Sequence, residues 1–160
     1  MTTSREAWLG NLLRDNGLWL AVAESCTGGM LGHLLTNVPG SSAYFKGGVI
    51  AYANEVKMEI LGVSPTTLDS FGAVSKETVL EMAKGIKSSF DADIGLSVSG
   101  IAGSEGGTME KPVGTVWIGL STPELEEAEV FLFSGDRKSI KEQAAQSAME
   151  IAIRYLSEKK

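Results

Sequence analysis

The chain has 160 residues, of which 43% are hydrophobic and 21% charged, values typical of one globular domain with a single core. Its net charge of -6 argues against nucleic acid or an anionic membrane as the main partner, since both require a basic face. No apolar stretch approaches the ~18 residues of a membrane span, and the N-terminus lacks the basic and then apolar pattern of a signal peptide. We therefore expect a cytoplasmic protein.

The chain has one cysteine and one histidine, Cys26 and His33. A single cysteine forms no intrachain disulfide, which is compatible with a reducing compartment. A His-based zinc site or a Ser-His-Asp triad would have to be built around His33 alone. We expect no metal, no cofactor and a small buried thiol at Cys26.

Hydrophobic periodicity and turn residues divide the chain into helices and strands. In chain order the predicted elements are a helix at 3–17, a strand at 19–23, a helix at 27–37, a strand at 47–53, helices at 54–60, 64–70 and 75–90, strands at 93–99, 113–121 and 128–134, and a helix from 136 onward. Thr3 with Glu6 has capping-box spacing, and Asn54, Ser64 and Ser75 are predicted to cap the helices that they begin.

Strands alternating with helices, with one hairpin near the end, predict a single α/β domain over residues 1–160: a layered, mixed and mostly parallel sheet flanked by helices. Ligands of such sheets bind beyond the carboxyl ends of the strands. Three glycine-containing stretches follow predicted strands and are expected to meet in one cleft: ESCTGG (24–29), SGIAGSEGG (99–107) and SGDRKS (134–139).

The first of these stretches changes abruptly from apolar residues to small polar ones. Ser25 can offer a hydroxyl to a ligand, and the N–H groups of Thr27, Gly28 and Gly29 can bind an anion or an oxyanion. A plain helix N-cap formed by Ser25 or Thr27 explains the same residues equally well. Glu24, at the end of a buried strand, is either a site residue or the acceptor for several backbone donors.

A second candidate is PGSSAYFKGGVIAYANEVK (39–57), which contains Ser41, Ser42, Tyr44, Tyr52 and Lys57. A serine becomes nucleophilic when a neighbour removes its proton, and a partly buried lysine of lowered pKa is a suitable base where histidine is scarce. Tyrosine can hold or relay that proton. The alternative is a turn serine, a tyrosine at the rim of the core and a solvated lysine.

The other two glycine-containing stretches predict ligand contacts. SGIAGSEGG matches neither the P-loop nor the dinucleotide-binding pattern, so it predicts a flexible loop whose backbone approaches a ligand, with Lys111 nearby. Arg137 stands at the start of the last helix, where its charge opposes the helix dipole, and this favours either a bound anion or a plain surface arginine.

Seven stretches, in this order, resemble the C-terminal domain of the competence/damage-inducible CinA family. They are AESCTGG (23–29), TNVPGSSAYFKGGVIAYANEVK (36–57), LGV (61–63), GAVS (72–75), SVSGIAG (97–103), KPVGTVW (111–117) and GDR (135–137). The resemblance covers essentially the whole chain, except that Ser104-Glu105 stands where the family commonly has Pro-Asp. Stand-alone members of this family are nicotinamide-nucleotide amidohydrolases of the PncC type.

The resemblance implies hydrolysis of the carboxamide of nicotinamide mononucleotide to nicotinate mononucleotide and ammonia, by serine, lysine and tyrosine without a metal. The implied catalytic residues are Ser42, Tyr52 and Lys57, with Ser25 as an alternative nucleophile and an oxyanion site near Gly28 or Gly103. The implied substrate-binding residues are Glu24, Thr27, Gly28, Gly29, Gly100, Ile101, Ala102, Gly103 and Arg137.

Two other functions fit the same sequence: an inactive relative that binds pyridine nucleotide, and an amidohydrolase for a different amide. Correct residue types do not exclude the first, because a displacement of about 1 Å can lower the rate about 100-fold. A role in DNA binding has no support from a chain without a basic stripe. We also expect a homo-oligomer, since dimers are the commonest state of soluble enzymes.

Overall fold

The computed structural model describes residues 3–159, and its strands form one mixed sheet in the order β2-β1-β3-β4-β5. The strands are β1 (Leu20–Glu24), β2 (Phe45–Ile50), β3 (Ile94–Gly100), β4 (Thr115–Ser121) and β5 (Glu126–Leu132). Strand β1 pairs in parallel with β2 and β3, whereas β4 is antiparallel to both β3 and β5. Only β4 therefore runs against the others, which confirms the mixed, mostly parallel sheet.

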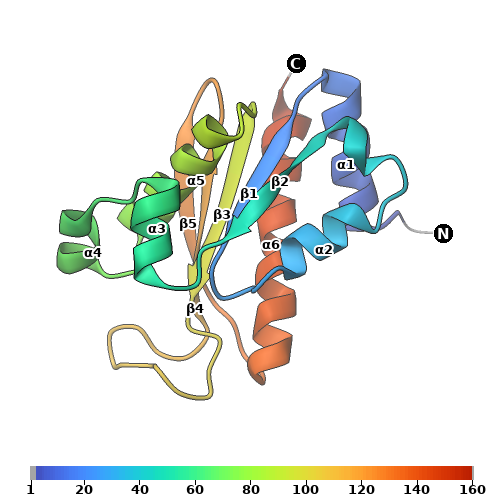
Figure 1. Ribbon diagram of the computed structural model, residues 1–160. Coiled ribbons are helices and arrows are strands. Elements are labelled where there is room, and N and C mark those ends of the chain that lie inside the picture. Colours follow the sequence, from blue (N-terminus) through green and yellow to red (C-terminus); the bar gives the residue numbers. More distant parts are fainter. Residues whose placement is uncertain (1–2, 160) are drawn as a thin grey trace.

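Helices cover both faces of this sheet (Figure 1). One layer contains α1 (Arg5–Asn16), α2 (Met30–Thr36) and α6 (Arg137–Glu158). The other layer contains α3 (Asn54–Leu61), α4 (Pro65–Phe71) and α5 (Lys76–Ser89). The α/β class and the single domain are confirmed. None of the helices in the described range is long and apolar enough to cross a membrane.

Two hydrophobic clusters hold these layers to the sheet. Leu9 and Leu13 of α1 pack with α6 against one face, and Val79, Met82 and Ile86 of α5 pack against the other. Each fully buried side chain of this kind contributes about 1.5–3 kcal/mol. The central strands β1 and β3 are buried on both faces, as their continuous apolar runs predict.

The predicted helix starts are mostly confirmed. Ser64, Ser75 and Asp136 each accept a hydrogen bond from a backbone N–H in the first turn of the following helix. The prediction is wrong at α1, where Ser4 rather than Thr3 is the cap. It is also wrong at α3: Ala53 occupies the N-cap position, and Asn54 is already the first helical residue and makes no capping bond.

Three predicted boundaries are shifted for identifiable reasons. Helix α2 begins at Met30 because Gly28 and Gly29 have φ angles of 57° and 104°, outside the helical region. Strand β2 lies at 45–50 rather than 47–53, since the chain turns toward α3 after Ala51. Strand β5 begins at Glu126, inside the predicted loop, because an exposed edge strand tolerates charged side chains.

Candidate active site

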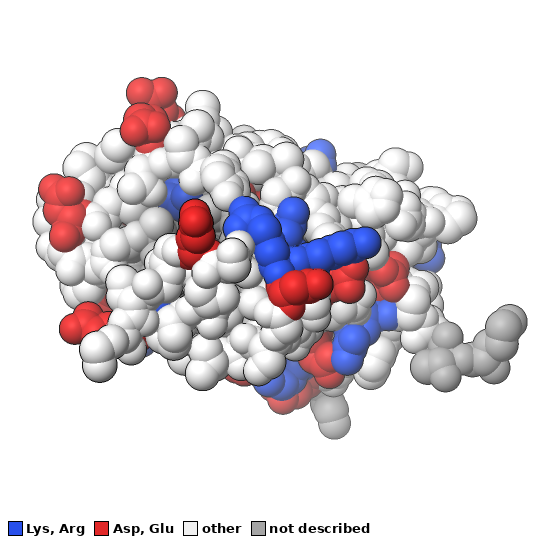
Figure 2. Space-filling model, turned by 90° about the horizontal axis from the view of Figure 1, so that it is seen from below, with Lys and Arg blue, Asp and Glu red and all other residues white. Residues whose placement is uncertain are grey.

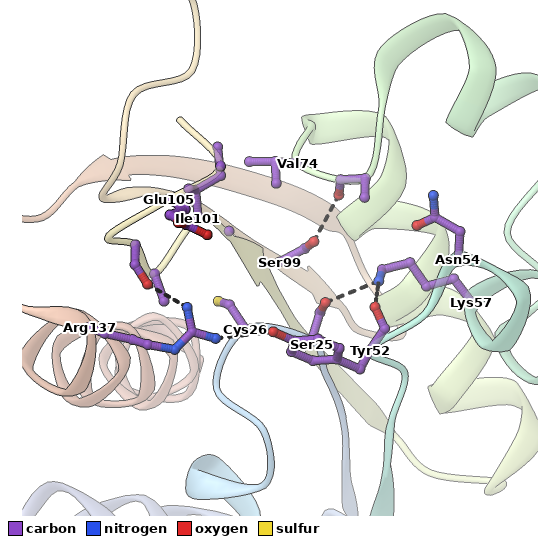
Figure 3. A pocket seen from close by; sticks show the side chains of 15 residues that line it. Ser25, Cys26, Tyr52, Asn54, Lys57, Val74, Ser99, Ile101, Glu105 and Arg137 are labelled. Carbon is purple, nitrogen blue, oxygen red and sulfur yellow. Dashed lines mark hydrogen bonds between the residues drawn. The ribbon is translucent and has the colours of Figure 1, made fainter. Parts of the chain in front are cut away.

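A cavity of about 280 Å³ lies beyond the carboxyl ends of β1, β2 and β3, where parallel strands place ligand sites (Figure 3). Its walls come from the turn after β1, the segment from Tyr52 to Lys57, the loop before α5, residues 99–106 and Arg137. The three glycine-containing stretches therefore meet at one end of the sheet. Within residues 3–159, no group of His, Cys, Asp and Glu side chains is arranged to hold a metal ion.

The cavity contains a buried serine and lysine in contact. Ser25 directly follows β1, and its backbone N–H donates to the carbonyl of Val98 on β3 at 2.9 Å, which fixes the turn. Lys57 projects from α3, and its Nζ lies 3.0 Å from Ser25 Oγ. The exposed fractions of the two residues are only 8% and 1%. The pair is therefore shielded from water and within proton-transfer distance.

The surroundings of Lys57 favour the neutral amine. Burial lowers the pKa of Lys57, and no carboxylate in the described part of the chain forms an ion pair with it. Its other neighbours are the carbonyl oxygens of Ala51 at 2.8 Å and Tyr52 at 3.1 Å. A neutral amine has two N–H donors for these carbonyls and one lone pair that can accept the Ser25 hydroxyl proton. The arrangement is suited to a serine nucleophile activated by a lysine base.

Cys26 adjoins Ser25 and lines the same cavity. Burial raises the pKa of its thiol to about 12, so the sulfur remains protonated and a poor nucleophile at neutral pH. The prediction of a small buried thiol is confirmed.

Glu24 lies on the other side of β1 from Ser25, because successive strand residues point to opposite faces. Its carboxylate is 2% exposed and accepts four hydrogen bonds. The donors are the Thr27 hydroxyl at 2.6 Å and the N–H groups of Gly29, Leu31 and Gly32 at 3.2, 2.9 and 3.0 Å. Of the two alternatives for Glu24, the structure shows the second: the carboxylate accepts hydrogen bonds from several backbone N–H groups. These bonds hold α2 and the preceding turn in place.

The predicted contacts of Glu24, Thr27, Gly28 and Gly29 with the ligand pocket are not formed, since none of these residues lines the cavity. The N–H of Gly28 donates to the carbonyl of Ser25 at 3.1 Å, so the oxyanion site expected there is wrong. By contrast, the N–H groups of Cys26 and Gly103 have no hydrogen-bond acceptor within residues 3–159. Both residues line the cavity, so these two N–H groups are candidates for an oxyanion site.

Ser42 lies far from Lys57, and the predicted contact between them is wrong. Ser42 is exposed in the 3-10 turn Ser41–Ala43, before β2, whereas Lys57 contacts the carbonyls directly after β2. The six residues of β2 separate the two by about 20 Å at ~3.3 Å per residue. Strand β2 thus holds Ser42 and Lys57 at opposite ends of the sheet.

Tyr52 and Arg137 form the rim of the cavity. The Tyr52 side chain is 61% exposed, and its hydroxyl accepts a hydrogen bond from Arg137 at 3.1 Å. The phenol is thus turned away from Lys57, which contacts only the Tyr52 carbonyl. Arg137 also donates to the carbonyl of Gly103, so it bridges two walls of the cavity (Figure 3).

Residues 100–103 line the cavity as predicted. Gly103 has a φ of 88°, and a Cβ at this position would lie 2.4 Å from the Val113 side chain, so only glycine fits. Lys111 is not part of the lining; its Nζ donates to the carbonyl of Phe71 at 2.7 Å and ties the loop to α4.

Among the lining residues, Asn54 and Val74 were not predicted as site residues, and Ser99 and Glu105 were predicted only as part of the stretch SGIAGSEGG. Ser99 donates to the carbonyl of Ala73 at 2.8 Å and thereby holds the loop before α5 against β3. The position of Ser99 at the end of a buried strand was a usable signal, because a polar residue there needs a partner.

Comparison with known proteins identifies the family. Residues 2–156 match the CinA C-terminal domain. The chain belongs to the CinA C-terminal domain family. It is 51% identical over 148 residues to a CinA-like protein of Thermotoga neapolitana. This match covers 92% of this chain and 36% of that protein. The chain spans little more than a third of the length of the curated CinA relatives that it matches.

Solved structures of CinA-family proteins share the fold over nearly the whole chain. The competence or damage-inducible protein from Enterobacter asburiae has a TM-score of 0.91 at 36% identity, and the match covers 97% of this chain and 99% of that one. The competence/damage inducible protein CihA from Agrobacterium tumefaciens has a TM-score of 0.90 at 34% identity, with 99% and 100% covered.

Proposed function

We propose that this CinA-family domain hydrolyses the carboxamide of nicotinamide mononucleotide, giving nicotinate mononucleotide and ammonia. The observation that carries the proposal is the contact of 3.0 Å between Ser25 Oγ and the buried Nζ of Lys57 inside the cavity. A Ser-Lys pair performs acyl transfer without histidine or metal. Ser25 is therefore the proposed nucleophile in place of Ser42, and Lys57 is the proposed base.

The proposed reaction has two stages. Ser25 Oγ transfers its proton to Lys57 and attacks the carboxamide carbon, whose oxygen becomes an oxyanion held by the N–H groups of Cys26 and Gly103. The C–N bond then breaks, Lys57 returns the proton to the leaving nitrogen, and ammonia departs. Water loses a proton to Lys57 and attacks the acyl-serine. Lys57 then returns that proton to Ser25 Oγ as the C–O bond to the serine breaks, which releases the acid and restores Ser25.

The size and charges of the cavity support a mononucleotide substrate. Its volume of about 280 Å³ is at the lower limit of ligand pockets, about 300–1,000 Å³, which favours a mononucleotide over a dinucleotide. Its lining includes one arginine and one carboxylate, Arg137 and Glu105. The guanidinium suits the phosphate, and the carboxylate suits the cationic pyridinium ring, whose charge also makes the carboxamide carbon more electrophilic.

The surface around the cavity also suits an anionic group. Figure 2 views this end of the molecule and shows basic side chains gathered near its centre, with acidic side chains directly beside them. The start of α6 at this end carries Arg137, Lys138 and Lys141. A local positive field here would attract a phosphate despite the net charge of -6.

The test is ammonia release from nicotinamide mononucleotide, with nicotinamide and nicotinamide riboside as comparison substrates. Turnover of the mononucleotide, with much weaker turnover of the other two, is the expected result. Binding of all three without ammonia release would replace the proposal by a pyridine-nucleotide binding function. Ammonia release only from an unrelated amide would retain the chemistry and reject the substrate.

A further inference from the structure

We propose that Lys141 is a specificity-determining residue that binds the substrate phosphate together with Arg137, and that this pair of cations favours a phosphate with two negative charges. The inference rests on the proposed function and deepens it, because it names a second group that distinguishes the mononucleotide from its riboside. Lys141 belongs to α6 and follows Arg137 by one helical turn.

Helix α6 and the turn after β1 together place the Lys141 ammonium. Residues four apart on a helix lie on the same face, so Lys141 extends from the face of α6 that carries Arg137. Its Nζ lies 3.5 Å from the point where a Cβ at Gly28 would stand. Because Gly28 has no side chain, the ammonium can approach the backbone of this turn closely. Two other residues of the same turn, Ser25 and Cys26, line the cavity.

The charge of Lys141 acts on the wall of the cavity. Burial raises the pKa of the Cys26 thiol, and the positive charge of Lys141 opposes part of that rise. Cys26 lines the cavity. Figure 3 shows the Arg137 side chain reaching from α6 to the side of the cavity where Cys26 lies. Lys141 and Arg137 therefore present two positive charges to the same side of the site.

The Lys141 ammonium has no structural partner that explains its position. Lys141 is half-buried, but its Nζ forms neither an ion pair nor a hydrogen bond with any group within residues 3–159. The other half-buried lysines each donate to a carbonyl or carboxylate oxygen: Lys87 to Thr122, Lys111 to Phe71 and Lys159 to Glu124. A partly desolvated cation without a partner gains most from an anionic ligand.

The chemistry of a terminal phosphate matches two cations. A phosphate monoester carries a charge of about −1.5 to −2 at pH 7 and has three strong acceptor oxygens. Arg137 already uses N–H donors at the rim, for the Gly103 carbonyl and the Tyr52 hydroxyl, so its remaining donors leave acceptors for a second cation. The riboside has no phosphate, and a phosphate methyl ester carries only one charge. Loss of Lys141 should therefore weaken binding more as the phosphate charge increases.

The first experiment measures binding by the full chain, with Ser25→Ala in every variant to prevent turnover. Calorimetry gives the affinities for nicotinamide mononucleotide, its phosphate methyl ester and nicotinamide riboside. We expect Lys141→Gln to weaken binding of the mononucleotide about 10-fold, that of the methyl ester less, and that of the riboside by less than about 2-fold. Lys141→Arg keeps the charge and should retain the preference for the mononucleotide. Lys84→Gln, an exposed residue of α5 outside the cavity lining, is the matched control and should leave all three affinities unchanged.

The second experiment is a double-mutant cycle of Lys141→Gln with Arg137→Gln, measured by the same binding assay. Two residues that hold one phosphate should give losses that are not additive, whereas independent residues give additive losses. Additive losses, equal weakening of the mononucleotide and the riboside by Lys141→Gln, or unchanged affinities in that variant would overturn the role of Lys141. If Lys141→Gln weakens only the binding of the phosphorylated ligands but the wild type releases no ammonia, the proposed function is rejected and the phosphate site is retained.

Discussion

Two serine-containing turns of this domain look alike in sequence but differ in what surrounds them. Ser25 follows β1 and Ser42 precedes β2, and each lies close to glycine. Strands β1 and β2 are neighbours and run in parallel. The end of one and the start of the next therefore lie at opposite ends of the sheet. Ser25 meets the buried amine of Lys57, whereas Ser42 is exposed without it. The direction of the strand, more than the residue type, decides which serine can react.

The strongest test of this comparison is Ser25→Ala. We expect a loss of kcat by a factor of roughly 10³ or more, because removal of a serine nucleophile eliminates the covalent route. Ammonia release from nicotinamide mononucleotide is the measurement, with substrate binding followed by calorimetry to show that the pocket is intact. Retained turnover in a folded Ser25→Ala variant would remove Ser25 from the mechanism.

Replacement of the base should have the next largest effect. Lys57→Met keeps the volume and apolar stem but removes the amine, and we expect kcat to fall about 10²- to 10⁴-fold. The pH profile of the wild type supplies a second readout. Since burial lowers the pKa of Lys57 and the reaction needs the neutral amine, kcat/KM should rise with pH through that lowered pKa and decline below it. If the wild type and Lys57→Met showed the same pH dependence of kcat/KM, that result would contradict the role of Lys57 as base.

Much of the fold was predictable because its signals are local. Helix caps such as Ser75 and Asp136 and the buried runs of β1 and β3 depend on residues within a few positions of one another. The topology rule for parallel strands also predicted that the glycine-containing stretches would meet. The predicted element boundaries were wrong where backbone dihedral angles decide them. The positive φ angles of Gly28 and Gly29, for example, delay the start of α2 to Met30.

The partner of Lys57 was not predictable from spacing. Ser42 is 15 residues before Lys57 and Ser25 is 32 residues before it, yet the more distant serine makes the contact. Pairing of β1 with β2 places Glu24 opposite Ile50, and so brings the residues that follow both strands together. The hydrogen bonds of Glu24 were not predictable from spacing either. Only the geometry of the turn shows that all four donors to its carboxylate come from the residues that directly follow it, Thr27 to Gly32.

Arg137 should affect substrate binding more than chemistry. We expect Arg137→Gln to raise KM for nicotinamide mononucleotide about 10- to 100-fold, since a charged hydrogen bond contributes about 1.5–3 kcal/mol. Turnover of nicotinamide riboside, which has no phosphate, should change little. Lys84→Gln, an exposed residue of α5 outside the cavity lining, is the control. An equal rise of KM for both substrates would mean that Arg137 only holds the rim together.

Glu24→Gln tests whether Glu24 stabilises the turn without binding the substrate, because Glu24 is next to Ser25 but does not line the cavity. A glutamine has one acceptor oxygen in place of two, so some of the four donors to Glu24 lose their partner. We expect the free energy of unfolding to fall by about 1–3 kcal/mol, measured by urea denaturation. KM at a temperature where the variant is folded should stay within about 2-fold of the wild type, and a much larger rise would return Glu24 to the binding site.

Ser42→Ala should have the smallest effect, and for that reason it separates the two turns most clearly. Ser42 is exposed, forms no side-chain hydrogen bond within residues 3–159 and is one strand length from the cavity. Surface substitutions of this kind usually change stability by less than about 0.5 kcal/mol. Ammonia release and the urea midpoint should therefore both match the wild type. If Ser42→Ala were inactive while folded, residue 42 would have to reach the cavity from a neighbouring copy of the chain, because its own strand holds it away from Lys57. Mixing inactive Ser25→Ala with inactive Ser42→Ala protein would then restore activity in the mixed assembly, and a failure to do so would exclude that route.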